Sequence, residues 1–244
     1  MLLRDFLTGP LDLRLILAGA LFSLGWAYGC LSLAGYLKIH RGVRTGYTRK
    51  IFHLLIFTSA VVAHALGGFN GVCVFGAMVS VVVAHAIMLG PTNSRYLALA
   101  REQDRPNRTR LIVIPYFATL IGGLVSNIFF GPIAVVGYLV GGLGDAAGEP
   151  AGTRWGKHPY VWRSGRATVA KTFEGSFAVL VASAAALLIG VAITPELHFG
   201  LRGAIAIPAI AMVCTLVEAF SPRGWDNVPM QIVPTILTTL WLTK

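Results

Sequence analysis

Eight apolar runs divide this chain, and each is long enough to cross a bilayer as a helix. They cover approximately residues 13–37, 51–68, 71–90, 111–130, 132–148, 172–194, 203–220 and 228–242. A transmembrane helix needs roughly 20 apolar residues, because every backbone polar group in lipid must be paired within its own segment. With 55% hydrophobic and 12% charged residues, the composition excludes an ordinary soluble domain. We therefore predict an all-α polytopic integral membrane protein with about eight transmembrane helices, as a single domain over residues 1–244.

Three connections between these runs are short and marked by glycine or proline. They lie at residues 68–71, 131–132 and 195–203. Glycine and proline are the residues that most often end a helix or turn the chain. We expect tight turns at these three places, whereas the other internal connections are longer and polar.

The basic residues predict the orientation in the membrane. Sixteen of the 20 Lys and Arg residues lie in the connections 38–50, 91–110, 149–171 and 221–227, and only four lie on the other side. Because cytoplasmic loops carry an excess of Lys and Arg, these loops are predicted to be cytoplasmic and both termini to be outside. The net charge of +10 then reflects attraction to an anionic leaflet, so no nucleic-acid partner is expected.

Five of the ten acidic residues lie at the predicted cytoplasmic ends of the spans. They are Asp145, Glu149, Glu174, Glu218 and Asp226. A charged group at membrane depth is costly unless it is paired or hydrated, so each is a candidate functional residue. The alternative is simple ion pairing with neighbouring Arg and Lys side chains. Five acids at one depth favour a shared, water-accessible site at the cytoplasmic face.

The stretch 144–176 has the composition of a metal and phosphate site. Asp145 and Glu149 are four residues apart and share a face if the helix continues, while Pro150 is expected to end that helix just after Glu149. Carboxylates at a helix end are suitable ligands for Mg²⁺, which also keeps waters and phosphate oxygens. The predicted metal ligands are Asp145, Glu149, Glu174 and Glu218.

Glycines and basic residues in the same stretch predict phosphate binding. Gly137, Gly141 and Gly144 are expected to allow close helix packing, whereas Gly152 and Gly156 lie among charged residues, where backbone can approach phosphate. Two other stretches lie on the predicted cytoplasmic side, RKIFH at 49–53 and the closing segment 218–227. The predicted nucleotide-binding residues are Gly152, Arg154, Gly156, Lys157, Lys171, Thr172, Gly175, Ser176, Asn227, Lys50 and His53.

These motifs resemble those of membrane lipid enzymes that use CTP. GD-x3-EP-x-GTRWGKH at 144–158 and KTFEGS at 171–176 are similar to a motif shared by the polyprenol kinases (dolichol, phytol and farnesol kinases and the CTP-dependent diacylglycerol kinase) and the phosphatidate cytidylyltransferases. RKIFH at 49–53 and VEAFSPRGWDNVP at 217–229 resemble elements of the kinase branch. The resemblance implies CTP as the phosphate donor, Mg²⁺ as the cofactor and a membrane lipid alcohol as the acceptor.

The predicted activity is a CTP-dependent transfer of the γ-phosphate to a lipid alcohol at the cytoplasmic face of a bacterial inner membrane or an organelle membrane. Asp145, Asp226 and Lys171 are the predicted catalytic residues, and either Asp145 or Asp226 would accept the proton of the alcohol. The alternatives are a phosphatidate cytidylyltransferase and, more distantly, a transporter. The expected partners are a nucleoside triphosphate, the lipid alcohol and the bilayer, and self-association stays open.

Overall fold

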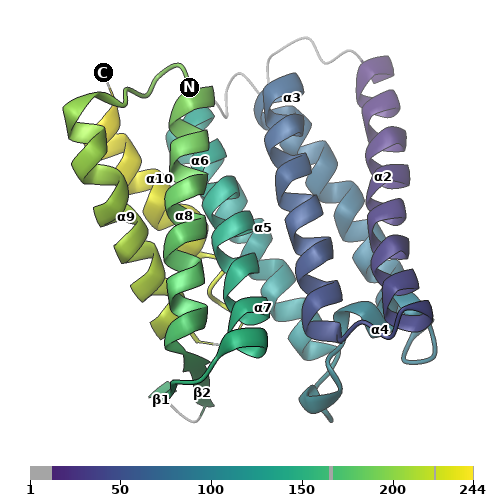
Figure 1. Cartoon of the computed structure of the whole chain (residues 1–244). Coiled ribbons are helices and arrows are strands. Elements are labelled where there is room, and N and C mark those ends of the chain that lie inside the picture. Colours follow the sequence, from purple (N-terminus) through teal and green to yellow (C-terminus); the bar gives the residue numbers. More distant parts are fainter. Residues whose placement is uncertain (1–12, 165–166, 223, 244) are drawn as a thin grey trace. The chain divides into compact units, whose positions relative to one another are not determined.

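The computed structural model describes residues 13–164, 167–222 and 224–243, which belong to two compact units, Met1–Val113 and Ile114–Lys244 (Figure 1). Within these described ranges, five helices are long and apolar enough to cross a membrane: Arg14–His40, Thr45–Leu89, Arg110–Trp155, Phe173–Ile193 and Gly200–Phe220. A shorter apolar helix covers Pro229–Leu242. The predicted helical membrane architecture is confirmed at this level. Two of the topology predictions concern residues outside the described ranges. They are the outer position of residues 1–12 and Lys244, and the cytoplasmic position of Arg166 and Arg223.

The first unit contains one long helix that folds back on itself. Its elements are α2 (Leu13–His40), α3 (Thr45–Leu89), α4 (Ser94–Leu99) and the 3-10 turn η1 (Glu102–Asp104). Within α3, Gly68 has a φ of 56° and a ψ of −144°, a conformation that glycine adopts at little cost. A side chain at Gly71 would collide with the carbonyl oxygen of Ala63, so the two halves of α3 lie against each other. The predicted tight turn at 68–71 is confirmed.

Polar side chains of α2 and α4 connect the elements of the first unit. Trp26 of α2 donates from Nε1 to Oγ of Ser59 in α3 at 2.8 Å. Arg95 of α4 donates from Nε to Oγ of Ser32 at 3.0 Å, and its guanidinium lies 4.1 Å from the ring centroid of Tyr28. The cation–π contact and the hydrogen bond place α4 against α2. The connection 91–110 therefore contains a packed short helix where the sequence predicted only a polar loop.

The second unit contains most of α5 (Arg110–Phe130) and the remaining elements. These are η2 (Gly131–Ile133), α6 (Ala134–Leu139), η3 (Val140–Gly144), α7 (Asp145–Trp155), β1 (Pro159–Ser164), β2 (Ala167–Thr172), α8 (Phe173–Ile193), α9 (Gly200–Phe220) and α10 (Pro229–Leu242). Helix α8 packs against α7 and α9, and α10 packs against α9 and α6. The strands, the C-terminal end of α7 and the first turn of α8 lie together at one end of this unit (Figure 1).

The chain reverses between α5 and α6 at Gly131. This glycine has a φ of 55°, and Pro132 follows it in η2. Tyr138 donates from its hydroxyl to the carbonyl oxygen of Gly123 at 3.4 Å, a contact that a straight helix would not allow across 15 residues. The predicted turn at 131–132 is therefore confirmed.

The helix that carries Asp145 is longer than predicted. Pro150 was expected to end it after Glu149, but α7 continues through Pro150 to Trp155. A proline inside a helix loses its own N–H hydrogen bond and crowds the carbonyl group four residues earlier, which weakens the helix. The helix persists because α7 packs closely on α8, where Gly148 and Gly152 face Val179 and Thr172.

A two-stranded antiparallel hairpin corrects the all-α prediction. Strands β1 and β2 pair from Pro159 with Thr172 to Ser164 with Ala167. The signal in the sequence is the content of aromatic and β-branched residues in PYVWRS and ATVAKT, with Gly-Arg between the two segments. Because the segment is too short to cross a membrane, hydropathy alone predicts only a connection between spans here.

Candidate active site

Three carboxylates from separate parts of the second unit converge in space. Each of Asp145, Glu218 and Asp226 offers a ligand atom, and the three atoms lie within 4.8 Å of one another. Asp145 is 4% exposed and Glu218 is 7% exposed, while Asp226 is half-buried. Three carboxylates at this spacing repel one another strongly in a partly buried place, so the arrangement needs compensating positive charge. We name these three residues the acid cluster.

Each residue of the acid cluster is positioned by a different element. Asp145 begins α7, directly after the π-helical turn η3. Glu218 lies in the last turn of α9, and Asp226 lies in the connection to α10, where its Oδ1 accepts from the backbone N–H of Asn227 at 3.2 Å. A π turn adds one residue to a helical turn and changes the face on which the following residues lie. The chain therefore gathers the cluster from two helix ends and one loop.

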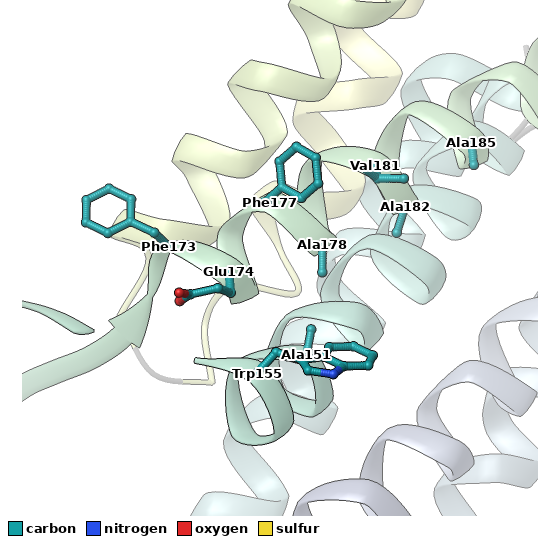
Figure 2. Close-up of a pocket in the computed structure, with 9 residues that line it drawn as sticks. All are labelled: Ala151, Trp155, Phe173, Glu174, Phe177, Ala178, Val181, Ala182 and Ala185. Carbon is teal, nitrogen blue, oxygen red and sulfur yellow. The ribbon is translucent and has the colours of Figure 1, made fainter. Parts of the chain in front are cut away.

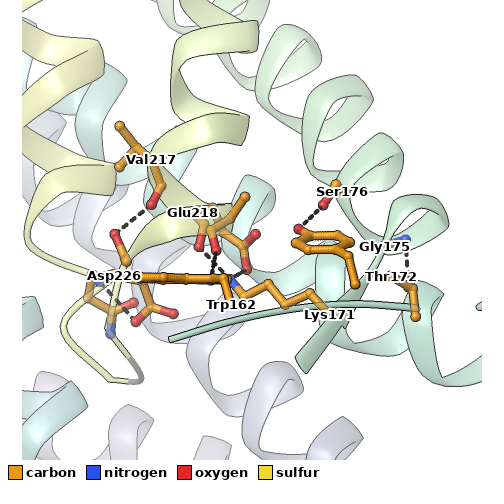
Figure 3. A network of polar contacts seen from close by, with 12 residues as sticks. Trp162, Lys171, Thr172, Gly175, Ser176, Val217, Glu218 and Asp226 are labelled. Atoms are coloured by element: carbon orange, nitrogen blue, oxygen red, sulfur yellow. Dashed lines mark hydrogen bonds and ion pairs between the residues drawn. The ribbon is translucent and has the colours of Figure 1, made fainter. Parts of the chain in front are cut away.

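Lys171 of β2 supplies a positive charge to the acid cluster. Its Nζ lies 2.6 Å from Oε1 of Glu218 and also donates to the carbonyl oxygen of Glu218. Figure 3 shows the lysine side chain extending from the strand toward Glu218, with Asp226 beyond. One lysine and three carboxylates give the four side chains a formal charge of −2. That is the charge that one divalent cation balances.

Two aromatic side chains of β1 attach the hairpin that carries Lys171 to neighbouring helices. Tyr160, the partner of Lys171 across the ladder, has its hydroxyl 2.7 Å from Oγ of Ser176 in α8. Trp162 donates from Nε1 to the carbonyl oxygen of Ala219 at 2.8 Å. Residues two apart on a strand share a face, so Tyr160 and Trp162 attach the face that carries Lys171 to α8 and α9.

Glycines bring α7 against the start of α8. An added side chain at Gly148 would lie 2.9 Å from Cγ2 of Val179, and one at Gly175 would lie 2.9 Å from the carbonyl oxygen of Gly148. Gly152 faces Thr172 in the same way, with 2.8 Å to its Oγ1. Close approach of helix backbones through small residues is common in membrane proteins. The predicted packing role extends to Gly152, whose predicted contact with phosphate stays a prediction.

Comparison with family models, with curated proteins and with solved structures finds no match. The acid cluster, Lys171 and the hairpin of β1 and β2 are therefore the features that bear on the function of the chain.

The structure separates the predicted metal ligands into two groups. Asp145 and Glu218 belong to the acid cluster, together with Asp226, which was predicted as a catalytic residue. Among the described residues, the converging group contains neither Glu149 nor Glu174. Glu149 is half-buried one turn after Asp145 in α7, and Glu174 lies in the first turn of α8, 2.7 Å from Nδ1 of His158.

The predicted phosphate-binding hydroxyls and amide have partners within the protein. Thr172 is the N-cap of α8 and accepts from the backbone N–H of Gly175 at 3.1 Å, which satisfies a donor at the helix start. Asn227 donates from Nδ2 to Oγ1 of Thr119 at 2.7 Å and to the carbonyl oxygen of Pro115 at 3.0 Å. Its buried Oδ1 has no hydrogen-bond partner among the described residues, so it is available to a ligand or water.

The predicted basic residues other than Lys171 are exposed or lie in the first unit. Arg154 and Lys157 are exposed at the end of α7, and Gly156 is the C-cap of that helix. In the first unit, Lys50 is 8% exposed, and the His53 ring lies 4.4 Å from the ring centroid of Phe57. The predicted contribution of Lys50 and His53 to the site stays a prediction.

Sequence reasoning missed three residues that support the site. His158 pairs with Glu174, and Tyr160 and Trp162 fix the hairpin. His158 was part of the motif quoted at 144–158, and the two aromatics alternate along β1. The strand signal in PYVWRS would have placed Tyr160 and Trp162 on one face, but not the elements that they contact.

Proposed function

We propose that this chain is a multi-pass membrane kinase that transfers the γ-phosphate of CTP to the hydroxyl of a lipid alcohol of the polyprenol, dolichol, phytol or farnesol class. The observation that carries the proposal is the convergence of Asp145, Glu218 and Asp226, with Lys171 paired to one of them. Phosphoryl transfer requires mainly positioning and charge neutralisation, which such a cluster supplies. The choice of CTP rests on the resemblance of the motifs.

The proposed topology has eight membrane passes, cytoplasmic basic loops and both termini outside. Two features support it: the reversals at Gly68 and Gly131, and segments of about 20 residues on either side of each reversal, the length that a bilayer requires. Asp145 comes shortly before the basic connection 149–171, and Glu218 comes shortly before the connection 221–227, so we place the site at the cytoplasmic face.

The acid cluster fits a magnesium ion in ligand type, number and charge. Mg²⁺ is bound in phosphoryl-transfer enzymes by one or a few carboxylates together with phosphate oxygens and waters. Asp145, Glu218 and Asp226 would hold it, and their net charge with Lys171 matches one divalent cation. When bound, the ion would neutralise oxygens of the triphosphate and help to align it.

The protein residues then have separate roles in the transfer. Lys171, Arg154 and Lys157 would neutralise phosphate oxygens as charge develops. Asp226, the most accessible member of the acid cluster, would accept the hydroxyl proton as the alcohol oxygen forms its bond to the γ-phosphorus. The bond from the γ-phosphorus to the bridging oxygen breaks at the same time, so CDP leaves and the phosphorylated alcohol remains.

Product identification with purified protein tests the proposal. The protein in liposomes receives CTP labelled in either the α- or the γ-phosphate, with phytol, farnesol, dolichol or phosphatidate as the acceptor. CDP and a γ-labelled lipid phosphate support the kinase. Pyrophosphate and an α-labelled CDP-lipid would instead identify a phosphatidate cytidylyltransferase, and solute flux without CTP would identify a transporter.

An Asp145→Asn variant tests the role of the acid cluster. We expect the transfer rate to fall by at least about a hundredfold, the usual effect of removing one strong electrostatic contact in an active site. Glu102→Gln, at an exposed acid of η1, is the matched control and should keep the wild-type rate. Near-normal transfer by Asp145→Asn, in protein that inserts normally, would refute the assignment.

A further inference from the structure

An apolar groove runs along α8 on the second unit. This groove is open to the outside and has a volume of about 670 Å³, within the range of small-ligand sites. The residues that line it are Ala151, Trp155, Phe173, Glu174, Phe177, Ala178, Val181, Ala182 and Ala185. Figure 2 shows that α7 contributes Ala151 and Trp155, and that the other labelled residues follow one face of α8. We call this feature the α8 groove.

Its shape suits one extended hydrocarbon chain. Ala178, Ala182 and Ala185 are spaced four and three residues apart, so they form a smooth floor along one helix face. Phe177 and Trp155, which are 65% and 62% exposed, stand beside this floor. From Glu174 to Ala185 the groove is roughly 17 Å long at 1.5 Å per residue. That is about half of the ~30 Å hydrocarbon core of a bilayer.

One end of the α8 groove is polar. Glu174 is the single charged residue in the lining, and its Oε1 lies 2.7 Å from Nδ1 of His158. A carboxylate accepts hydrogen bonds, and the hydroxyl group of a lipid alcohol can donate one. A hydroxyl group therefore complements this end, and a hydrocarbon tail complements the rest.

The polar end is also close to the acid cluster along the chain. Lys171, which pairs with Glu218, is two residues before Phe173, so their Cα atoms lie within about 7.6 Å of each other. Asp145 is six residues before Ala151 in α7, roughly 9 Å along the helix axis. A hydroxyl held at Glu174 is thus within a short distance of the elements that carry the cluster.

We propose that the α8 groove binds the tail of a lipid alcohol and that Glu174 and His158 receive its hydroxyl. The identification of this lipid as the phosphate acceptor rests on the proposed kinase function. Glu174 then selects the acceptor and is not a metal ligand. Because the groove covers only about half of the hydrocarbon thickness, it distinguishes the part of the tail next to the hydroxyl, and longer tails continue into the bilayer.

Filling the groove is the direct test. Ala182 lies eight residues after Glu174, roughly 12 Å from the polar end, so Ala182→Phe should block a long tail and spare a short one. We expect KM for geranylgeraniol to rise about tenfold, while that for prenol, whose tail does not reach Ala182, stays unchanged. Ala192→Phe, at an exposed alanine of α8 outside the lining, is the matched control and should change neither.

A second variant tests the groove independently if Ala182→Phe does not fold. Phe177 is exposed, so Phe177→Ala removes a side of the groove with little effect on the core. It should also raise KM for geranylgeraniol and leave kcat near the wild-type value. Unchanged KM for the long alcohol in both variants would overturn the proposal while leaving the kinase function intact.

Photolabelling separates the groove from the enzymatic activity. Geranylgeraniol with a diazirine on its tail should label residues 174–185, and unlabelled geranylgeraniol should suppress the labelling. Suppression of the same labelling by Ala182→Phe would support the groove even if no alcohol were phosphorylated, a result that would refute only the kinase function. Labelling spread over all lipid-facing helices, or suppressed equally by added phosphatidylcholine, would show ordinary bilayer contact and overturn the proposal.

Discussion

Removing the charge of Lys171 should make the stability of the protein depend on magnesium. In Lys171→Met, three carboxylates within 4.8 Å of one another lose the positive charge that lies 2.6 Å from Oε1 of Glu218. The side chains of Lys171 and Glu218 are 20% and 10% exposed, so the pair is more buried than a surface ion pair. Breaking a buried pair on one side typically costs 3–5 kcal/mol, and an exposed pair is worth less than about 1 kcal/mol.

We therefore expect the free energy of unfolding to fall by about 3 kcal/mol in the absence of divalent cations. For a chain of this size that corresponds to a decrease in Tm of roughly 6–12 °C. Magnesium should recover much of the loss, because the cluster would then carry a charge of about −3 that a divalent ion partly neutralises. Glu218→Gln added to Lys171→Met should also recover stability, since it removes the unpaired charge.

Thermal unfolding in detergent, with EDTA or with Mg²⁺, measures these effects. Lys157→Met is the matched control, because this exposed lysine lies outside the acid cluster, and it should shift Tm by little in either condition. If Lys171→Met were as stable as wild type in EDTA, or if Mg²⁺ raised both Tm values equally, the charge balance argued for the cluster would be wrong.

Three further outcomes follow from the same structure. Gly175→Ala should lower the free energy of unfolding by about 1–3 kcal/mol in a denaturation assay, because the added methyl group meets the carbonyl oxygen of Gly148. Gly25→Ala is the control: its methyl group meets nothing within 4 Å, so this variant should not be destabilised. Trp162→Phe removes the donor to Ala219 and should cost about 1 kcal/mol and increase proteolysis in the hairpin; unchanged protease resistance would contradict its anchoring role. Reporter tags at both termini should be accessible from outside the membrane, and tags in the basic loops should be protected in right-side-out vesicles.

Much of the site could be predicted from charge and membrane depth. The sequence predicts Asp145, Glu218 and Asp226 as site residues because an acidic residue at the end of an apolar span is costly unless it is paired or functional. In the structure, the carboxylates of these three residues do converge. The selection among the five acids could not be made from the sequence. Glu174 is three residues from Lys171, yet its carboxylate pairs with His158, while Lys171 reaches Glu218 across 47 residues.

The fold shows the same limit. The turns at Gly68 and Gly131 followed from glycine and proline in short breaks between apolar runs, and the structure has both. The prediction that α7 ends before Pro150 was wrong, because the stabilisation from packing α7 on α8 outweighs the local free-energy cost of a proline in the helix. The hairpin was missed because its strands are stabilised by contacts of Tyr160 and Trp162 with distant helices, and no local pattern specifies those partners.

The π turn η3 makes the site sensitive to chain length as well as to residue type. A residue deleted from Val140–Gly144 would return the segment to regular α-helix and turn Asp145 by about 100° relative to α6, away from Glu218 and Asp226. Such a chain would retain every acidic and basic residue discussed above and still lack the cluster. In an alignment of related chains, a one-residue gap in this turn would therefore be a stronger sign that the acid cluster is lost than many substitutions in the motif beside it.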